Sequence, residues 1–262
     1  MCSNNNITVT LLGTGTSGGV PSLGCQCEVC RSKDPRDHRL RCVALVESAA
    51  GTRVLIDCGP DIRQQLMPLP FKPFDAILMT HIHYDHVGGI DDLRPFSVFG
   101  PINLYGDEKT CDHVRQIMPY CFGEHLYPGV PRLELHTIRL HEPLRIGDLE
   151  IIPIEVMHGK MPILGFRIGK FAYITDMKTI GDAELPYLDG VETLVVNALR
   201  FEKEHHSHQL VADAAEFAHK IGAKQTYITH VCHHIGLYDE AEKRMPEGLS
   251  LAYDGLKLTV ER

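Results

Sequence analysis

Residues 79–89 read MTHIHYDHVGG and place four side chains that can bind metal within six positions: His81, His83, Asp85 and His86. The apolar residues just before them indicate a buried strand at Phe74–Thr80. In an extended segment, side chains at i and i+2 point the same way, so the first two histidines can reach one metal ion. The chain then turns toward a helix, so the aspartate and the last histidine can reach a second ion, and the two following glycines let the backbone turn tightly behind the site. Imidazole and carboxylate ligands together suit Zn, Fe or Mn.

The composition limits the class of protein. The chain has 262 residues, 44% of them apolar and 23% charged, which is typical of a globular domain with a substantial core. No apolar run approaches the ~20 residues of a membrane helix, and the start, MCSNNNITVT, has no secretory signal. We therefore expect a single domain over residues 1–262, located in the cytoplasm, with no membrane contact.

Charge and cysteine content give two further expectations. The net charge of −8 argues against the basic face of a nucleic-acid-binding protein, so we expect no stable nucleic-acid complex. Nine cysteines, scattered except for one cluster, are typical of a reducing compartment in which some thiols bind metal.

Strand and helix patterns are mixed without strict βαβ alternation. We expect strands at Ile7–Leu12, Cys42–Ser48, Arg53–Cys58, Phe74–Thr80, Leu149–His158, Gly165–Gly169, Phe171–Asp176, Val191–Ala198, Tyr227–His230 and within Leu249–Val260. We expect helices at Asp61–Leu66, Asp107–Met118, Ser207–Ile221 and Asp239–Met245, and another that begins within Val87–Leu93. Several strands follow one another directly, which favours mixed sheets with helices outside over a doubly wound parallel sheet.

Two short segments invite a binding interpretation. The glycine-rich residues 13–19 lack the Lys-Ser/Thr ending of a phosphate-binding loop, so we interpret them as a tight turn beside the metal site. Residues 25–30 read CQCEVC, and thiols this close in sequence rarely form disulfides with one another. The cluster could pair with distant cysteines, act in redox chemistry, or bind zinc. A Cys₃His zinc site needs a fourth ligand, for which His233 is the candidate and its neighbour His234 the competitor.

The H-x-H-x-D-H pattern of residues 81–86 resembles the signature of the metallo-β-lactamase superfamily, and strand-end residues farther along the chain match its later ligands. The resemblance implies an α/β fold, the αββα sandwich of two mixed β-sheets flanked by helices. It implies that metal 1 is bound by His81, His83 and His158, that metal 2 is bound by Asp85, His86 and His230, and that Asp176 bridges them. It further implies that Asp57, in VLIDCG, orients a ligand imidazole.

One subgroup of this superfamily combines C-x-C-x-x-C near the N-terminus with T-H-x-x-H near the C-terminus, and includes the cyclic phosphodiesterase associated with the carbon–phosphorus lyase pathway. Resemblance to it implies a structural zinc held by a loop at about residues 24–31, with the ligands Cys25, Cys27, Cys30 and His233. The segment HHSH at 205–208 resembles the subgroup's H-x-S-H pattern, which implies that His208 is the general acid. Asp85 is counted with it as catalytic, and Arg200 and His205 are candidate substrate contacts.

These residues predict a hydrolase with two divalent ions, Zn or Mn and alternatively Fe. Such a site lowers the pKa of a bridging water and stabilises charge on the attacking and leaving oxygens. A phosphodiester gains charge on its non-bridging oxygens during hydrolysis, which suits two cations. We expect small cyclic or nucleotide-derived phosphodiesters as substrates, and the resemblance implies a homodimer.

Other functions on the same scaffold are a thioesterase, a lactonase and a nuclease that processes tRNA 3′ ends. The nuclease normally needs a basic arm to grip tRNA, and neither such an insertion nor a basic charge balance is found. A thioesterase has less need of a proton donor, because a thiolate leaves easily. A non-catalytic role, as in the quinone-cofactor biosynthesis protein of the superfamily, is disfavoured because every ligand position is filled here.

Overall fold

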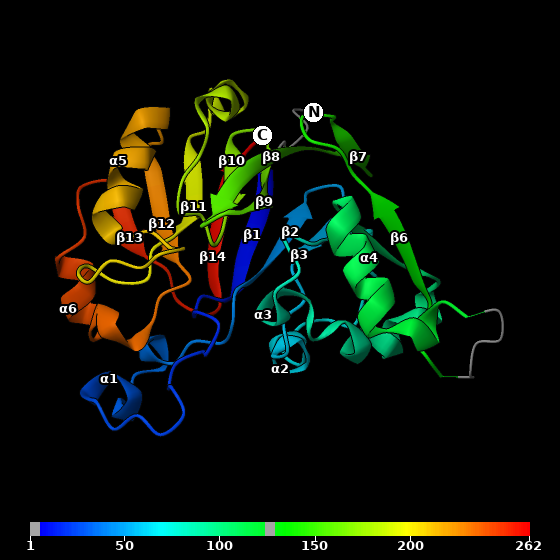
Figure 1. The fold of residues 1–262 in the computed structure, drawn as a ribbon, viewed down its shortest axis with the longest axis horizontal. Helices are drawn as coiled ribbons and strands as arrows, with labels where there is room; N and C mark the ends of the chain where they lie inside the picture. Colours follow the sequence, from blue (N-terminus) through cyan, green and yellow to red (C-terminus); the bar gives the residue numbers. More distant parts are fainter. Residues whose placement is uncertain (1–5, 124–128) are drawn as a thin grey trace.

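The structure is a computed structural model that describes residues 6–123 and 129–262. Within these residues, two seven-stranded sheets pack face to face, and helices cover the outer face of each sheet (Figure 1). The expected sandwich of two mixed β-sheets flanked by helices is confirmed.

The first sheet has the strand order β14-β1-β2-β3-β4-β5-β6. Its strands are β1 (Asn6–Gly13), β2 (Val43–Ser48), β3 (Arg53–Ile56), β4 (Ala76–Leu78), β5 (Ile102–Gly106), β6 (Leu133–Thr137) and β14 (Leu256–Glu261). Strands β3 to β6 pair in parallel, whereas β14, β1, β2 and β3 pair antiparallel. The parallel strands β3 and β4 therefore end at the same edge of the sheet.

The second sheet has the order β13-β12-β11-β10-β9-β8-β7. Its strands are β7 (Leu144–Ile146), β8 (Leu149–His158), β9 (Met161–Ile168), β10 (Phe171–Ile174), β11 (Thr193–Asn197), β12 (Gln225–Thr229) and β13 (Leu249–Leu251). Strands β10 to β13 pair in parallel, and β9 runs antiparallel to both β8 and β10. Strands β8, β10 and β12 consequently end at one edge as well.

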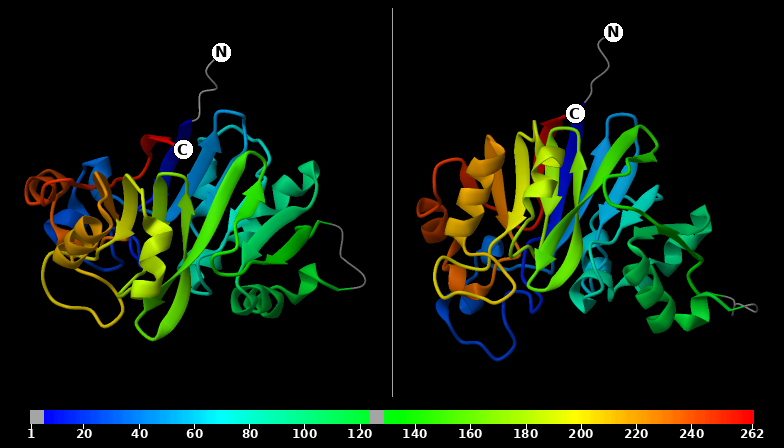
Figure 2. Two further views of the ribbon diagram at one scale, coloured as in Figure 1. Left: turned by 90° about the horizontal axis from the view of Figure 1, so that it is seen from above. Right: turned by 45° about the horizontal axis from the view of Figure 1, so that its top comes forward.

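The helices lie outside the two sheets. They are α1 (Glu28–Arg31), α2 (Ile62–Leu66), α3 (Tyr84–Val87), α4 (Glu108–Ile117), α5 (Val211–Ile221) and α6 (Tyr238–Lys243), together with the 3₁₀ helices η1 (Pro35–Asp37), η2 (Ile90–Phe99), η3 (Pro119–Cys121), η4 (Asp182–Leu188) and η5 (His233–Ile235). Helices α5 and α6 lie against the second sheet and α2 to α4 against the first (Figures 1 and 2). Along the described ranges, no helix combines the length and apolarity needed to cross a bilayer.

The core between the sheets comes from alternating strand residues. Ile7, Val9 and Leu11 of β1 are fully buried and pack in one cluster with Phe166 and Tyr173 of the second sheet. Alternate residues of a strand share one face, so these three side chains of β1 all point into the same core. Burying apolar side chains here stabilises the contact that holds the two sheets in fixed relation.

The helix expected at Ser207–Ile221 begins four residues later, at Val211. Residues 207–210 lie in a loop instead, where Leu199 N donates to the carbonyl of Gln209 and Val211 N donates to the carbonyl of Arg200. The Asp213 carboxylate accepts from Leu210 N at 2.9 Å, which caps the helix at this later position. The apolar periodicity correctly predicts the helix but extends it into a loop.

Three other regions depart from expectation. The helix expected to begin within Val87–Leu93 is instead one turn, α3, that starts at Tyr84, followed after two glycines by the 3₁₀ helix η2. Strands β5, β6 and β7 are short and lie toward one edge of each sheet, and their local sequences gave no separate strand prediction. The strand expected at Gly165–Gly169 is longer and begins at Met161.

Gly59 lies where the chain leaves the first sheet, and its missing side chain lets the loop pass close to the metal-binding segment. A Cβ there would collide with the carbonyl oxygen of Asp85. We expect Gly59→Ala to lower the free energy of unfolding by about 1–3 kcal/mol, because the overpacked backbone must shift. Thermal unfolding measures the loss.

The matched control is Gly181→Ala, since a Cβ at Gly181 meets nothing within 4 Å and its backbone φ is −74°. A melting temperature for Gly59→Ala equal to that of the control would show that this close approach is not a constraint on the fold.

Candidate metal centre

The predicted ligands all lie at the strand ends that converge at one edge of the sandwich. Asp57 follows β3 and the histidine-rich segment follows β4 in the first sheet, whereas in the second sheet His158 ends β8, Asp176 follows β10 and His230 follows β12. The two sheets thus contribute to one cluster, as the sequence predicts.

The backbone is unusual at three of these strand ends. Asp57, Asp176 and His230 have φ values of 66°, 57° and 55°, and they are three of the five non-glycine residues with positive φ in the described chain. Left-handed backbone is uncommon outside glycine, although aspartate and histidine tolerate it better than most residues. Each turn directs a polar side chain into the cluster immediately after a buried strand, and such strain typically marks functional sites.

Four of the predicted ligands form a tight group. One ligand atom from each of Asp85, His86, Asp176 and His230 lies within 4.8 Å of all the others, and all four side chains are buried. Asp176 Oδ2 lies 3.2 Å from His86 Nε2, and Asp176 Oδ1 lies 3.1 Å from His230 Nε2. The predicted metal-2 ligands and the predicted bridging aspartate are therefore close together.

This group fits a divalent cation. Two ligands of one tetrahedral zinc, each at about 2.0–2.1 Å, are separated by about 3.4 Å. The four nitrogen–oxygen separations in the group range from 3.1 to 3.6 Å. In addition, His86 Nε2 and both ring nitrogens of His230 are buried without a hydrogen bond among the described residues. A buried nitrogen that faces carboxylates without a hydrogen bond is satisfied by a shared cation.

The remaining predicted ligands lie beside this group. His81 Nε2 is 3.1 Å from His83 Nδ1, so both nitrogens can face one ion. The ring centroids of His83 and His158 are 5.0 Å apart. His158 Nδ1 contacts the carbonyl oxygens of Asp176 at 2.7 Å and Ser207 at 3.1 Å, which leaves its Nε2 for the centre. The three histidines therefore lie beside the first group, and Asp176 forms a second close group with His158 and His208, which His81 and His83 do not join.

Asp57 is the carboxylate that orients these imidazoles. Its Oδ2 lies 2.7 Å from His86 Nδ1, as predicted. It also accepts from Thr80, from the backbone N at 2.8 Å and from Oγ1 at 2.9 Å. Thr80 Oγ1 in turn lies 2.9 Å from His81 Nδ1. One buried carboxylate thus orients a ligand of each predicted ion, directly on one side and through a hydroxyl on the other.

Sequence reasoning missed Thr80, although it stands in the motif directly before His81. A threonine at a strand end is common and carries no metal-binding chemistry of its own. Only the pairing of β3 with β4, which brings Asp57 beside it, reveals that its hydroxyl links the carboxylate to the ligand imidazole.

The charge balance of the cluster also favours a cation. Burial raises the pKa of the Asp57 carboxyl and lowers the pKa of His81. Burial opposes ionisation of Asp85 as well, but the neighbouring imidazoles of His230 and His86 outweigh it and hold the pKa of Asp85 below its usual range. The buried carboxylates therefore call for positive charge, which a divalent ion supplies more fully than one imidazolium.

His208 lies against this centre rather than outside it. Its ring is 4.7 Å from that of His158 and 4.8 Å from that of His230, and its Nδ1 is 3.6 Å from Asp176 Oδ1. Burial lowers the pKa of His208 to about 3. Its position beside the predicted ligands allows it either to act on a bound substrate or to bind a metal ion with His158 and Asp176.

The two predicted substrate contacts lie farther out. His205 is half-buried, with its ring centroid 5.0 Å from that of His208. Its Nδ1 lies 3.2 Å from Ser207 Oγ. Arg200 lies at the start of the same loop, and its Nε donates to the carbonyl of Lys203 at 2.9 Å.

The cysteine cluster also converges as predicted. The Sγ atoms of Cys25 and Cys27 are each 3.3 Å from His233 Nδ1, and Cys30 completes a group whose ligand atoms lie within 4.8 Å. The contact with His233 lowers the pKa of Cys27 to about 6, in the direction of the thiolate that binds metal. This Cys₃His set suits tetrahedral zinc and attaches the loop that carries α1 to η5, next to His230.

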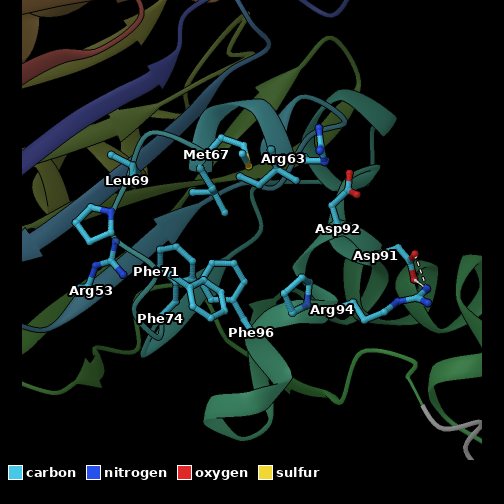
Figure 3. A pocket seen from close by; sticks show the side chains of 14 residues that line it. Arg53, Arg63, Met67, Leu69, Phe71, Phe74, Asp91, Asp92, Arg94 and Phe96 are labelled. Atoms are coloured by element: carbon cyan, nitrogen blue, oxygen red, sulfur yellow. Dashed lines mark hydrogen bonds and ion pairs between the residues drawn. The ribbon is translucent and has the colours of Figure 1, made fainter.

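An apolar cavity lies elsewhere, between α2 and η2. Its volume is about 570 Å³, and Phe71, Phe74 and Phe96 gather on one side of it, with Arg53 close by (Figure 3). The ring centroids of Phe71 and Phe96 are 4.8 Å apart. None of the predicted ligands lines this cavity, so it is separate from the metal centre.

Comparison with known proteins agrees with the geometry. A family model described as a β-lactamase superfamily domain matches residues 52–231. The chain belongs to the β-lactamase superfamily. The matched segment includes Asp57 and all seven predicted ligands of the binuclear site. The metallo-β-lactamase fold implies divalent metal ions, and the histidine and aspartate cluster fits a binuclear site.

Three similar proteins of differing function stand out. A Porphyromonas gingivalis protein named octanoyltransferase is 41% identical over 251 residues, which are 96% of this chain but 51% of that protein. A solved structure described as a new diphosphatase from the PhnP family is 39% identical, with a TM-score of 0.89 and 97% of each chain covered. Zn²⁺-bound PqqB from Methylobacterium extorquens has a TM-score of 0.75 at 21% identity, covers 96% of this chain and 99% of its own, and shows the fold alone. The chain spans about half the length of the curated relatives it matches.

Thr80→Val tests the link between Asp57 and His81. The valine keeps the shape but removes the hydroxyl, which leaves the Asp57 carboxylate short of a donor and His81 without its partner. We expect metal affinity to fall about 10- to 100-fold and the free energy of unfolding to fall by about 1–3 kcal/mol. Competition with a chelator measures the affinity.

Thr226→Val is the matched control, because the buried Thr226 hydroxyl has no hydrogen-bond partner in the described chain. This control should keep its metal and be as stable as the parent protein or more so. Equal metal affinity in the two variants would contradict the role of Thr80.

His233→Ala tests the cysteine site separately from the binuclear centre. It removes one of four ligands, so we expect elemental analysis to show one zinc equivalent fewer while the other metal ions remain. His234→Ala changes the adjacent residue, which lies outside the ligand group, and should retain the full metal content. If the two variants lost the same ion, His233 would not be the specific ligand.

Proposed function

We propose that this chain is a metal-dependent hydrolase that cleaves phosphodiester bonds in small cyclic or nucleotide-derived substrates. The observation that carries the proposal is the position of Asp176, whose two oxygens face imidazoles from both sheets. His86 lies beside Oδ2, while His230 and His208 lie beside Oδ1. Asp176 also belongs to a second possible ligand group with His158 and His208, so its carboxylate suits two adjoining ions better than a single one.

The residues have separate roles in this proposal. His81, His83 and His158 would hold one divalent ion, Asp85, His86 and His230 the other, and Asp176 both. Zn, Mn or Fe bound there would activate water and neutralise phosphate charge. Asp57 and Thr80 keep the ligand rings in place, so the centre needs little rearrangement as charge develops on the substrate.

His208 is placed to deliver a proton to the leaving oxygen. Its ring lies between those of His158 and His205, at the outer side of the centre. Burial opposes its protonation, but the negative charge of a bound phosphodiester acts in the opposite direction. An alkoxide is a poor leaving group unless it is protonated as the bond breaks, and general acids of this kind contribute about 10²- to 10⁴-fold.

The solved structure named a diphosphatase of the PhnP family supports phosphorus chemistry at this site, since it is 39% identical over nearly the whole chain. The name of the P. gingivalis protein favours a second candidate, hydrolysis of a medium-chain acyl thioester. Because only about half of that protein matches this chain, its acyl-transfer activity can reside in the unmatched half.

A substrate panel separates the two candidates. It contains bis-p-nitrophenyl phosphate, a 2′,3′-cyclic nucleotide and an octanoyl thioester, tested with Zn- and Mn-loaded protein. Turnover of the phosphodiesters alone supports the proposal, whereas turnover of the thioester alone supports the second candidate. Sedimentation of the same samples tests the homodimer expected from sequence.

Substitutions at Asp176 and His208 separate metal binding from proton donation. Asp176→Ala should lose metal pairing and turnover of every substrate. His208→Ala should keep both ions and lose about 10²- to 10⁴-fold in kcat on the 2′,3′-cyclic nucleotide, whose leaving alkoxide needs a proton. The loss on bis-p-nitrophenyl phosphate should be smaller, because p-nitrophenolate leaves without one.

The control for His208→Ala is His206→Ala, since His206 is an exposed residue of the same segment. If His208→Ala lost a metal ion and affected both leaving groups equally, His208 would be a ligand with His158 and Asp176 rather than a proton donor.

A further inference from the structure

Asn197 is a buried polar residue at the end of β11, between the two strands that lead to Asp176 and His230. Strand β11 pairs in parallel with β10 on one side and with β12 on the other. Asn197 interrupts the apolar run of residues 194–199 and is fully buried. Burying an amide among apolar side chains is costly unless its hydrogen bonds are made. Strand β11 contributes none of the predicted ligands, so the amide has no place in the ligand set itself.

The amide of Asn197 makes two hydrogen bonds, and both join it to the backbone of Met177. Its Oδ1 accepts from Met177 N at 2.7 Å, and its Nδ2 donates to the Met177 carbonyl at 2.9 Å. Because a backbone N–H only donates and a carbonyl only accepts, a single orientation of the amide satisfies both groups. Asn197 therefore holds the residue that directly follows Asp176.

The peptide unit between Asp176 and Met177 is held from two sides. Its N–H is bound by Asn197, and its carbonyl oxygen accepts from His158 Nδ1 at 2.7 Å. The unit is planar, so the hydrogen bond that fixes its N–H also fixes the direction of its carbonyl. His158 Nδ1 lies 3.1 Å from the Ser207 carbonyl as well. A continuous set of hydrogen bonds thus leads from Asn197 through this peptide to a predicted metal ligand.

The same peptide follows a residue with left-handed backbone. Asp176 has φ 57°, a conformation that persists outside glycine only where the surrounding contacts over-determine it. The Thr175 hydroxyl donates to Asp176 Oδ2 at 2.7 Å and so restrains the carboxylate. The two bonds from Asn197 restrain the backbone. Without them, Asp176 can relax toward an ordinary conformation that directs its carboxylate away from His86 and His230.

We propose that Asn197 is a positioning residue of the metal centre. By holding the peptide that joins Asp176 to Met177, it sets both the direction of the Asp176 carboxylate and the orientation of the His158 ring. The inference rests on the two-ion site of the proposed function, in which His158 holds one ion and Asp176 holds both. Asn197 itself contacts neither ion nor substrate in this arrangement, and acts only through the two ligands.

Asn197→Leu tests the proposal, because leucine is similar in volume and removes both hydrogen bonds. We expect metal affinity to fall about 10- to 100-fold, the usual effect of losing a residue that orients metal ligands. Competition with a chelator measures this loss. Electron paramagnetic resonance of Mn²⁺-loaded protein gives a second readout, since two Mn²⁺ ions joined by a shared ligand are magnetically coupled. The parent protein should show a coupled pair, and the variant should show mainly isolated ions at equal bound metal.

Thr52→Val is the matched control. It also removes two hydrogen bonds of a buried side chain, since Thr52 Oγ1 donates to Asp148 Oδ1 at 2.6 Å and accepts from Asp148 N at 3.3 Å. Thr52 precedes β3 whereas Asp57 follows it, so Thr52 lies at the end of that strand away from the metal centre. The control should lower the melting temperature but keep the metal affinity and the coupled spectrum.

Asn197→Ala is a second variant that folds even if the leucine variant does not. The space it leaves can hold a water molecule that satisfies both backbone groups of Met177. A water holds the peptide less firmly than a side chain anchored in β11, so metal affinity should fall about tenfold.

Two outcomes would overturn the proposal: parental metal affinity in the Asn197 variants that fold, or an equal loss of affinity in Thr52→Val. Failure of the proposed function is distinct, because it would appear as absence of phosphodiester hydrolysis in the substrate panel, and the binding measurements contain no substrate. A parent protein with only isolated Mn²⁺ would contradict the two-ion site, while the affinity comparison would still decide the role of Asn197.

Discussion

The shared carboxylate of Asp176 is the interaction on which the arrangement of the site depends. It follows a strand of the second sheet, yet it contacts His86 from the first sheet as well as His230 from its own. With Asp57 and Asp85 also buried nearby, the edge of the sandwich concentrates negative charge in a region of low dielectric. Such a cluster is costly unless cations balance it. Ion binding and the joining of the two sheets at this edge are therefore coupled.

The fold supplies this geometry through its strand ends. Parallel strands of each sheet end at a common edge, and a left-handed residue turns the chain at three of those ends. Rigid strands fix where each Cα lies, and the turn fixes where the side chain points. Asp57 and Thr80 then fix the imidazole rings by hydrogen bonds. The positions of the ligand side chains are thus set first by backbone geometry and then by polar contacts.

Some of these features could be predicted from the sequence, and others could not. The superfamily, the sandwich and the convergence of the ligands followed from His81 to His86, because a dense motif after an apolar strand leaves few alternatives. The predicted start of α5 was wrong, since periodicity cannot show that Gln209 pairs with Leu199 and Val211 with Arg200. Thr80 was missed for a similar reason. Its role depends on the pairing of β3 with β4, two strands that are distant in sequence.

The division between the metal centre and its surrounding loop bears on specificity. Divalent ions held by the imidazole and carboxylate set would polarise any ester that reaches them, so this set would discriminate poorly between phosphodiesters and acyl esters. Residues 200–210 differ in kind, because they place His208 beside the centre. This segment forms a loop rather than a helix, and its ends are joined by the backbone hydrogen bonds of Gln209 with Leu199 and of Val211 with Arg200. A change of substrate on this fold therefore needs changes in this loop, while the strand-end ligands stay the same.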